Sequence, residues 1–229
     1  MSDKFFDYFS ILIKGLPVTL SLSFAGIITA CLIAIILSVL ITTTSKWYIV
    51  KPIKTYLIVF TGTPLLVQLF LIYYGPAQFT FISQNLPSLW RVISQPWFCA
   101  YLALTLNSAA YTTQIFAGAI KAVPQGQWQA CVALGMNKTQ TLKVILPYAL
   151  KRALSTYSNE IIFVVKGTAL TSTITLMDIM GYNQFLYGTY YEFSIFIATG
   201  CIYLLINGLL SIMMRLIEKR ALAFESTTH

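Results

Sequence analysis

The sequence predicts an all-α membrane protein with five transmembrane helices. Of its 229 residues, 57% are hydrophobic and only 10% are charged, a composition far from that of a soluble domain. A bilayer span needs about 20 mostly apolar residues. Four stretches without any charged residue are long enough: Gly15–Ser45, Thr55–Trp90, Val92–Ile120 and Phe193–Met214. A fifth, weaker stretch, Ser155–Met180, contains Glu160 and Lys166.

The distribution of positive charge predicts the orientation of these spans. Basic residues gather in the first loop, the third loop and the C-terminal tail: Lys46, Lys51, Lys54, Lys121, Lys138, Lys143, Lys151, Arg152, Arg215, Lys219 and Arg220. The second loop has only Arg91, and the fourth has none. By the positive-inside rule, the N-terminus lies outside and the C-terminus is cytoplasmic. The net charge of +8 therefore reflects topology in a lipid bilayer, and no nucleic-acid partner is expected.

The first two helices follow from apolar length and from their prolines. After an external lead over residues 1–14, the first helix is expected over Pro17–Ile41, because proline at a first turn loses no intrahelical bond. Its apolar run is too long for a signal peptide, and no small-residue cleavage site follows it. The second helix is expected over Ile53–Tyr74. Gly62 and Pro64 lie inside this helix and predict a bend or local unwinding.

The longest external loop, Gly75–Pro96, contains apolar residues at helical spacing: Leu86, Leu89, Trp90 and Ile93. They predict a short helix that either anchors in the membrane interface or contacts an external partner. The remaining spans are expected over Trp97–Ile120, Ser155–Met180 and Phe193–Met214, followed by a cytoplasmic tail over residues 218–229.

Residues for enzymatic chemistry are missing from the sequence. There is no phosphate-binding loop of the GxxxxGK[ST] type, so the chain is not expected to bind ATP. The seven acidic residues are scattered, and the one histidine is the final residue, His229. The cysteines at 31, 99, 131 and 201 lack the close spacing of a metal site or a disulfide. We therefore expect neither an enzyme nor a cofactor in this chain.

Two spans carry polar residues at helical spacing. They are Asn107, Tyr111 and Gln114 on the third helix, and Thr168, Ser172 and Thr175 on the fourth. Residues at i, i+4 and i+7 share one helical face. Such a face turns away from lipid, either to line a water-filled path or to bond a neighbouring helix.

Glu160 and Lys166 are charges inside a predicted span, where each costs about 2.5–3.5 kcal/mol on insertion scales. Six residues separate them by about 9 Å along a helix and put them on different faces, so a direct ion pair is not expected. Glu160 lies near the cytoplasmic end, where water can reach it. Lys166 lies deeper, and either extends to the interface or takes part in a polar pathway.

A polar block at residues 125–147 interrupts the apolar chain on its cytoplasmic side. Its alanines and Leu134 favour a helix, and Gly135 is suited to end that helix in the left-handed conformation. Trp128 provides an anchor. Pro147 is expected to break the chain before the next span. A loop helix could have these features with or without a partner.

The run Gln129-Ala130-Cys131-Val132-Ala133-Leu134-Gly135, followed by Ile145-Leu146-Pro147, resembles the EAA-type signature of bacterial ABC-importer permeases. In that family this loop, here residues 121–147, is the coupling helix that docks on a separate ATPase subunit. Gln129 stands where glutamate is usual, and Cys131 where alanine is usual. The resemblance implies that a partner ATPase dimer binds ATP. It implies coupling contacts from Trp128, Gln129, Ala130, Cys131, Ala133, Leu134 and Gly135.

The run Gly62–Gln68 (GTPLLVQ) resembles the motif of polar amino-acid permeases, and Asn159, Glu160 and Lys166 fit the fourth-span pattern of that subfamily. Longer runs at residues 60–76, 106–114 and 206–225 resemble its arginine importers. Lysine, histidine or glutamine permeases are the alternatives. The resemblance implies a type I ABC-importer transmembrane domain over residues 15–217, in the bacterial inner membrane. The candidate translocation pathway comprises Asn107, Tyr111, Gln114, Asn159, Glu160, Lys166, Thr168 and Ser172.

The implied partners are a periplasmic binding protein, an amino-acid substrate and a second related permease. Four positions depart from the subfamily. Thr61, Gln114, Ala117 and Gly167 stand where Arg, Glu, Arg and Asp are usual. We hypothesise from these departures that the partner permease of a heterodimer holds most substrate contacts. A secondary transporter subunit, which would need ionisable relay groups or repeat symmetry, and a membrane scaffold are the rival functions.

Overall fold

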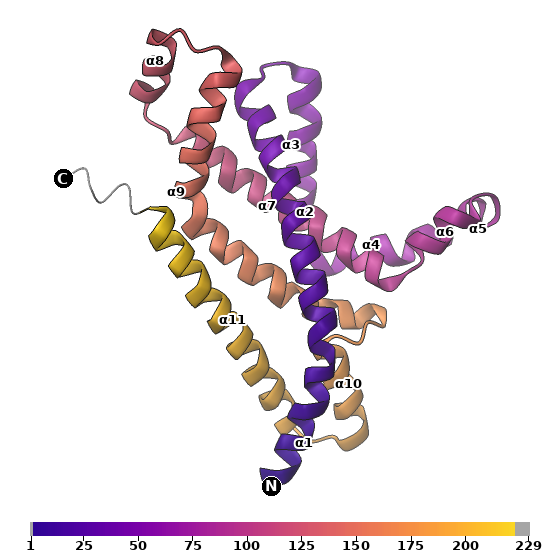
Figure 1. Cartoon of the computed structure of the whole chain (residues 1–229). Helices are drawn as coiled ribbons and strands as arrows, with labels where there is room; N and C mark the ends of the chain where they lie inside the picture. Colours follow the sequence, from indigo (N-terminus) through magenta and orange to yellow (C-terminus); the bar gives the residue numbers. More distant parts are fainter. Residues whose placement is uncertain (1, 223–229) are drawn as a thin grey trace.

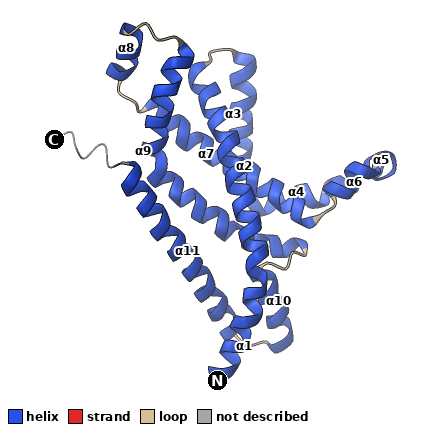
Figure 2. Ribbon diagram, in the orientation of Figure 1, coloured by secondary structure: helices blue, strands red, loops and turns tan. Residues whose placement is uncertain are grey.

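The computed structural model describes residues 2–222, without the side chains of residues 2–4, 80, 82 and 83. Every regular element in the described part is a helix, which confirms the all-α prediction (Figure 2). His229 and the end of the predicted tail lie outside the described residues.

The chain begins with a long, nearly continuous helical rod. α1 (Ser2–Leu12), the 3₁₀ turn η1 (Ile13–Gly15) and α2 (Leu16–Thr43) follow one another without a loop. Pro17 lies in the first turn of α2, as predicted. The helical structure nevertheless starts well before Pro17. The reason is tertiary: Tyr8 and Leu12 are buried in an apolar cluster with side chains of the C-terminal helices.

The second predicted span is bent. α3 (Trp47–Gly62) and α4 (Leu65–Tyr74) meet at an angle of 106°. Between them Thr63 and Pro64 adopt extended backbone conformations. The bend expected from Gly62 and Pro64 is therefore confirmed.

A helical hairpin projects from the molecule after α4 (Figure 1). It consists of η2 (Pro76–Gln78), α5 (Thr80–Asn85) and α6 (Pro87–Ile93). The short helix predicted in this loop is confirmed as α6.

The central helix of the molecule is α7 (Pro96–Lys121), which contacts α2, α3, α4 and α9. Its buried residues are mostly small and include Ala100, Ala103, Ala109 and Ala110. Small side chains allow helices to approach closely in a membrane protein.

The polar block at residues 125–147 forms α8 (Gln125–Ala133), after which α9 (Lys138–Gly167) begins. A reciprocal capping box between Asn137 and Gln140 starts α9. The expected chain break at Pro147 is wrong, because Pro147 lies inside α9. Proline removes one backbone bond there. On either side of it, Ile145 and Ala149 are fully buried in an apolar cluster that holds this part of the helix in place.

The fourth predicted span, Ser155–Met180, is not one helix. α9 ends at Gly167, continues as the 3₁₀ helix η3 (Thr168–Ile174), and is followed by α10 (Ile179–Tyr190) after a bend of 48°. Thr175 has a left-handed backbone with φ of 70°. The expected α-helical face of Thr168, Ser172 and Thr175 is therefore wrong, because a 3₁₀ helix and a turn do not keep the 3.6-residue period.

The last helix, α11 (Ser194–Ala221), extends the predicted fifth span into the tail. By length and apolar composition, two continuous helical segments of the described chain can cross a membrane, Phe5–Thr43 and Ser194–Ala221. The two bent pairs, α3 with α4 and α9–η3 with α10, raise that number to four if each pair forms one span.

A candidate translocation pathway and a coupling helix

The break between α3 and α4 is closed by a network of polar side chains. Gln68 donates through Nε2 to Phe60 O (2.9 Å), Thr63 O (3.0 Å) and Thr63 Oγ1 (2.8 Å). Asn107 of α7 donates through Nδ2 to Gln68 Oε1 (3.0 Å) and Phe60 O (3.1 Å). These bonds occupy carbonyl groups that a broken helix would leave without partners. The GTPLLVQ run therefore ends in the residue that stabilises the break.

The predicted polar face of α7 points at the same break. Tyr111 OH donates to Thr61 O (3.2 Å), and Gln114 Nε2 lies 3.4 Å from Thr61 Oγ1. Hydrogen bonding between helices thus accounts for much of this face. Tyr111 and Gln114 nevertheless remain exposed in the single chain, so both can also contact a ligand or a further subunit.

We expect Gln68→Leu to destabilise the protein by about 2 kcal/mol, because it removes the side-chain amide that donates to Phe60 O, Thr63 O and Thr63 Oγ1 and accepts from Asn107. Val67→Leu on the exposed side of α4 is the matched control and is expected to have little effect. Thermal unfolding of the purified protein in detergent measures both. Equal stability of Gln68→Leu and the wild type would contradict a role for Gln68 in holding the break.

A cavity of about 340 Å³ opens where α4, α7 and α9 meet. Its lining residues are Leu65 of α4, Leu104, Asn107, Ser108 and Tyr111 of α7, and Glu160, Phe163 and Val164 of α9. Small-molecule sites typically measure about 300–1,000 Å³ and combine apolar walls with a few polar groups. The cavity meets both criteria.

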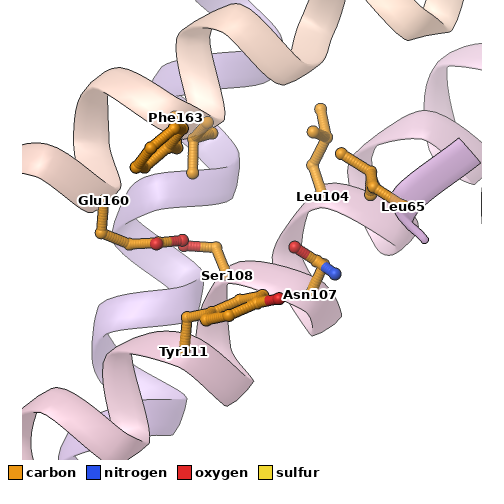
Figure 3. A pocket seen from close by; sticks show the side chains of 8 residues that line it. Leu65, Leu104, Asn107, Ser108, Tyr111, Glu160 and Phe163 are labelled. Carbon is orange, nitrogen blue, oxygen red and sulfur yellow. The ribbon is translucent and has the colours of Figure 1, made fainter. Parts of the chain in front are cut away.

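Glu160 extends from α9 toward α7, and its carboxylate lies beside the Ser108 side chain (Figure 3). Among the described residues that line this cavity, Glu160 alone is charged. Its side chain is 9% exposed. The prediction of a solvated position near the cytoplasmic end does not hold, because the packing of α7 against α9 covers the carboxylate. A buried carboxylate among a few polar groups in a mostly apolar cavity is suited to bind a cationic group.

Not every predicted pathway residue reaches this cavity. Asn159 and Lys166 are exposed and line a groove between α9 and α11, together with Asn207 and Leu204. The Lys166 ammonium lies 6.0 Å from the centre of the Phe163 ring, within the range of a cation–π contact. Since Phe163 also lines the cavity of Glu160, it separates the two sites. The expectation that Glu160 and Lys166 do not pair agrees with this arrangement.

Thr168 and Ser172 are buried in η3 and bond mainly to local carbonyls. Thr168 Oγ1 donates to Val165 O (2.8 Å), and Ser172 Oγ donates to Ala169 O (2.8 Å). Ser172 Oγ also accepts a bond from Gln184 Nε2 of α10 (3.2 Å). Ser172 therefore joins η3 to α10, and neither Thr168 nor Ser172 lines the Glu160 cavity.

Asp178 is a buried acidic residue that the sequence pattern did not single out. Its Oδ1 accepts a bond from the amide of Gly181 (2.8 Å) and caps α10, and its Oδ2 lies 3.4 Å from the hydroxyl of Tyr203 on α11. The available signal was an aspartate directly before an apolar run, which is a helix N-cap pattern. A second polar contact between α10 and α11 joins Asn183 Nδ2 to Thr199 Oγ1 at 2.7 Å.

The α8 helix ends as predicted. Gly135 has φ of +68°, and two bonds, Gly135 N to Val132 O (2.9 Å) and Met136 N to Cys131 O (3.0 Å), form a Schellman motif. Cys131 is buried, and Trp128 packs against the cluster that contains it.

The opposite side of α8 faces outward (Figure 1). Gln129, Ala130 and Ala133 are exposed, while Val132 and Leu134 are 73% and 74% exposed. α8 therefore has one side fixed to the molecule and an apolar side that residues 2–222 leave uncovered.

Among the four positions that depart from the subfamily pattern, Gly167 packs against two residues that line the cavity. Gly167 packs so closely that a Cβ there would lie 3.1 Å from Leu65 Cδ2 and 3.3 Å from Leu104 Cδ2. An aspartate would not fit without moving these side chains. Ala117 is buried, and the Thr61 hydroxyl accepts a hydrogen bond from Gln114 Nε2.

Residues 26–222 match the family described as binding-protein-dependent transport system inner membrane component. The arginine ABC transporter permease protein ArtM of Escherichia coli K12 is 56% identical over 220 residues, covering 96% of this chain and 98% of the relative. ArtM of Haemophilus influenzae is 54% identical over 222 residues, covering 96% of each. The crystal structure of an amino acid ABC transporter with histidines superposes with a TM-score of 0.81 at 30% identity. The superposition covers 93% of this chain and 95% of the chain in that structure.

These similarities confirm the predicted type I ABC-importer fold, the location in the inner membrane and a role in transport rather than enzymatic catalysis. They imply that this chain functions together with an ATPase, a binding protein and a second permease subunit. With its all-helical fold, the exposed side of α8 and a family match over most of its length, this chain belongs to the family of binding-protein-dependent transport system inner membrane components.

Proposed function

We propose that this chain is the permease subunit of an ATP-driven importer for arginine. The main observation in favour of this substrate is the cavity between α4, α7 and α9. Among the described residues that line this cavity, Glu160 alone is charged. Arginine carries a guanidinium group, which binds carboxylates through paired hydrogen bonds. The similarity to arginine permeases supports the same substrate.

In this proposal, substrate moves by alternating access. A periplasmic binding protein delivers the amino acid to the outward side. ATP bound by the partner ATPase dimer, and not by this chain, closes that dimer. The dimer then moves α8, whose residues Trp128 and Cys131 attach it to the helices behind it. Docking drives the change only if α8 binds the two ATPase states with different free energy.

Five spans with the N-terminus outside are part of the proposal. They are α1–α2, α3–α4, α7, α9–η3 with α10, and α11. The uncharged stretch of α7 and its 26 residues, about 39 Å of helix, support its place as the third span. The basic loops around α8 support a cytoplasmic location for that end.

A heterodimer with a second, related permease is the assembly we propose. Gln114 and Lys166 are exposed and lie outside the cavity lining. The groove with Asn159 and Asn207 offers polar groups to a second subunit across α9 and α11. The uncharged residues at Thr61, Gln114, Ala117 and Gly167 support a weaker substrate site in this chain than in its partner.

We expect Glu160→Gln to lower arginine uptake by about tenfold or more, because the cationic substrate loses its carboxylate contact. Vesicles that contain the whole complex measure uptake of labelled arginine in competition with lysine, histidine, ornithine and glutamine. Glu218→Gln, at the far end of α11, is the matched control and should transport normally.

Unchanged uptake in Glu160→Gln would remove Glu160 from the pathway but leave the transporter assignment intact. Competition by glutamine as strong as by arginine would overturn arginine as the substrate. Uptake that continues with ATP hydrolysis blocked would favour a secondary transporter. Absence of both uptake and ATPase association would favour a scaffold.

A further inference from the structure

The hairpin over Pro76–Ile93 has no role in the proposed transport cycle. It projects from the bundle, and α5 and α6 pack mainly against each other and against the adjoining η2 and α7 (Figure 1). From its base, α7 runs over 26 residues to α8. Since that is about 39 Å of helix, the hairpin lies at the opposite side of the membrane from α8.

The apolar side of α6 is left partly exposed by the residues that the structure describes. Leu86, Leu89 and Val92 are 45%, 47% and 44% exposed. Phe79 and Phe81, at the other end of the hairpin, are 63% and 67% exposed. A soluble monomer seldom leaves such a contiguous set of large apolar side chains in water.

The hairpin continues a surface of α4 that faces outward. Leu71 and Tyr74 of α4 are 67% and 50% exposed, and they line a shallow groove that reaches Gln78. Where the chain returns, Trp97 and Tyr101 of α7 stack with ring centres 5.5 Å apart. Amphipathic aromatic rings of this kind are enriched where hydrocarbon meets the headgroups. Exposed apolar side chains thus occur both on α4 and in the hairpin that follows it.

Charge distinguishes a lipid surface from a protein partner. Arg91 is the single charged residue between Lys54 and Lys121 in the sequence. Within α6, positions 89, 92 and 93 lie on one side of the helix, and position 91 lies on the other. Arg91 is exposed. An apolar face with an arginine opposite it complements hydrocarbon on one side and lipid phosphate on the other.

We propose that the hairpin over Pro76–Ile93 is a membrane-interface anchor. Leu86, Leu89 and Val92 enter the acyl region of the leaflet away from α8, and Arg91 binds lipid phosphate. The anchor holds the outer ends of α4 and α7, whose inner faces line the Glu160 cavity. The bilayer thereby fixes these two helices while other spans move.

The test places a nitroxide label at Leu89→Cys or, as the matched control on the same helix, at Arg91→Cys. Both are made in the full complex in nanodiscs, in a background without the four native cysteines. We expect the ratio of collisions with oxygen to collisions with an aqueous nickel chelate to be about threefold higher at position 89 than at position 91. Retained ATPase activity checks that each labelled complex is folded.

Equal exposure of both labels to the nickel chelate would place the hairpin in water and overturn the anchor. Protection of the Leu89→Cys label only after addition of the soluble binding protein would assign this surface to that protein instead. Brominated lipids provide a second readout with the native cysteines present. They should quench fluorescence in the wild type by more than in Trp90→Phe, and equal quenching would contradict the proposal.

Discussion

Leu134→Asp is expected to reduce ATP-driven uptake by at least about tenfold, since 1.4 kcal/mol of lost docking free energy is already sufficient for that. Leu134 is 74% exposed on the side of α8 that has no partner in this chain. If α8 docks on an ATPase, this side chain is buried there, and an unpaired carboxylate in its place costs several kcal/mol. Co-purification of the ATPase and its hydrolysis rate in liposomes measure the loss directly.

The matched control for Leu134→Asp is Leu216→Asp. Leu216 is 58% exposed near the basic end of α11. The same chemical change there should leave ATPase association intact. Because Leu134 is exposed in the isolated chain, its substitution should not affect folding. Normal ATPase binding and normal uptake by Leu134→Asp would rule out docking through this face.

The second large effect is expected at Gly15. A methyl group at Gly15 would overlap the backbone of Asp178 and Ile179, where the start of α2 crosses the start of α10. Backbone cannot move aside as a flexible side chain can, so Gly15→Ala should cost about 3 kcal/mol or more. We expect a lower thermal unfolding temperature and less protein in the membrane fraction.

Gly118→Ala on α7 is the control for this prediction. A methyl group there would meet no heavy atom within 4 Å of those described. Because alanine favours helix, stability should stay equal or rise by roughly 0.5–1 kcal/mol. If Gly15→Ala were as stable as Gly118→Ala, the close crossing of α2 and α10 would not be a feature of the folded protein.

Local signals in the sequence were sufficient for much of the fold. The length of the apolar stretches and their lack of charged residues predicted the all-α fold class and the positions of α2, α7 and α11. Pro64 correctly predicted the break between α3 and α4, because proline has no amide hydrogen to donate. The left-handed end of α8 was correctly predicted from Gly135, because glycine has no Cβ and readily adopts positive φ. These features depend on residues that are neighbours along the chain.

Other predictions failed where distant segments override local preference. Pro147 was expected to end a helix, but buried neighbours on both sides keep α9 continuous. The helical spacing of Thr168, Ser172 and Thr175 suggested one α-helical face, whereas the chain forms a 3₁₀ helix and a left-handed turn. No prediction was made for Asp178, whose contact with Tyr203 joins residues 25 positions apart.

The sequence by itself determined that this chain is a helical membrane protein with a helix in its third loop and a polar face on α7. Only the tertiary structure decided which polar groups meet. It directs Gln68 and Asn107 to the break in the second span, and Glu160 to a cavity beside Ser108. It directs Lys166 to a separate groove. The physical reason is that periodicity fixes the face of a helix, whereas packing between helices fixes what that face touches.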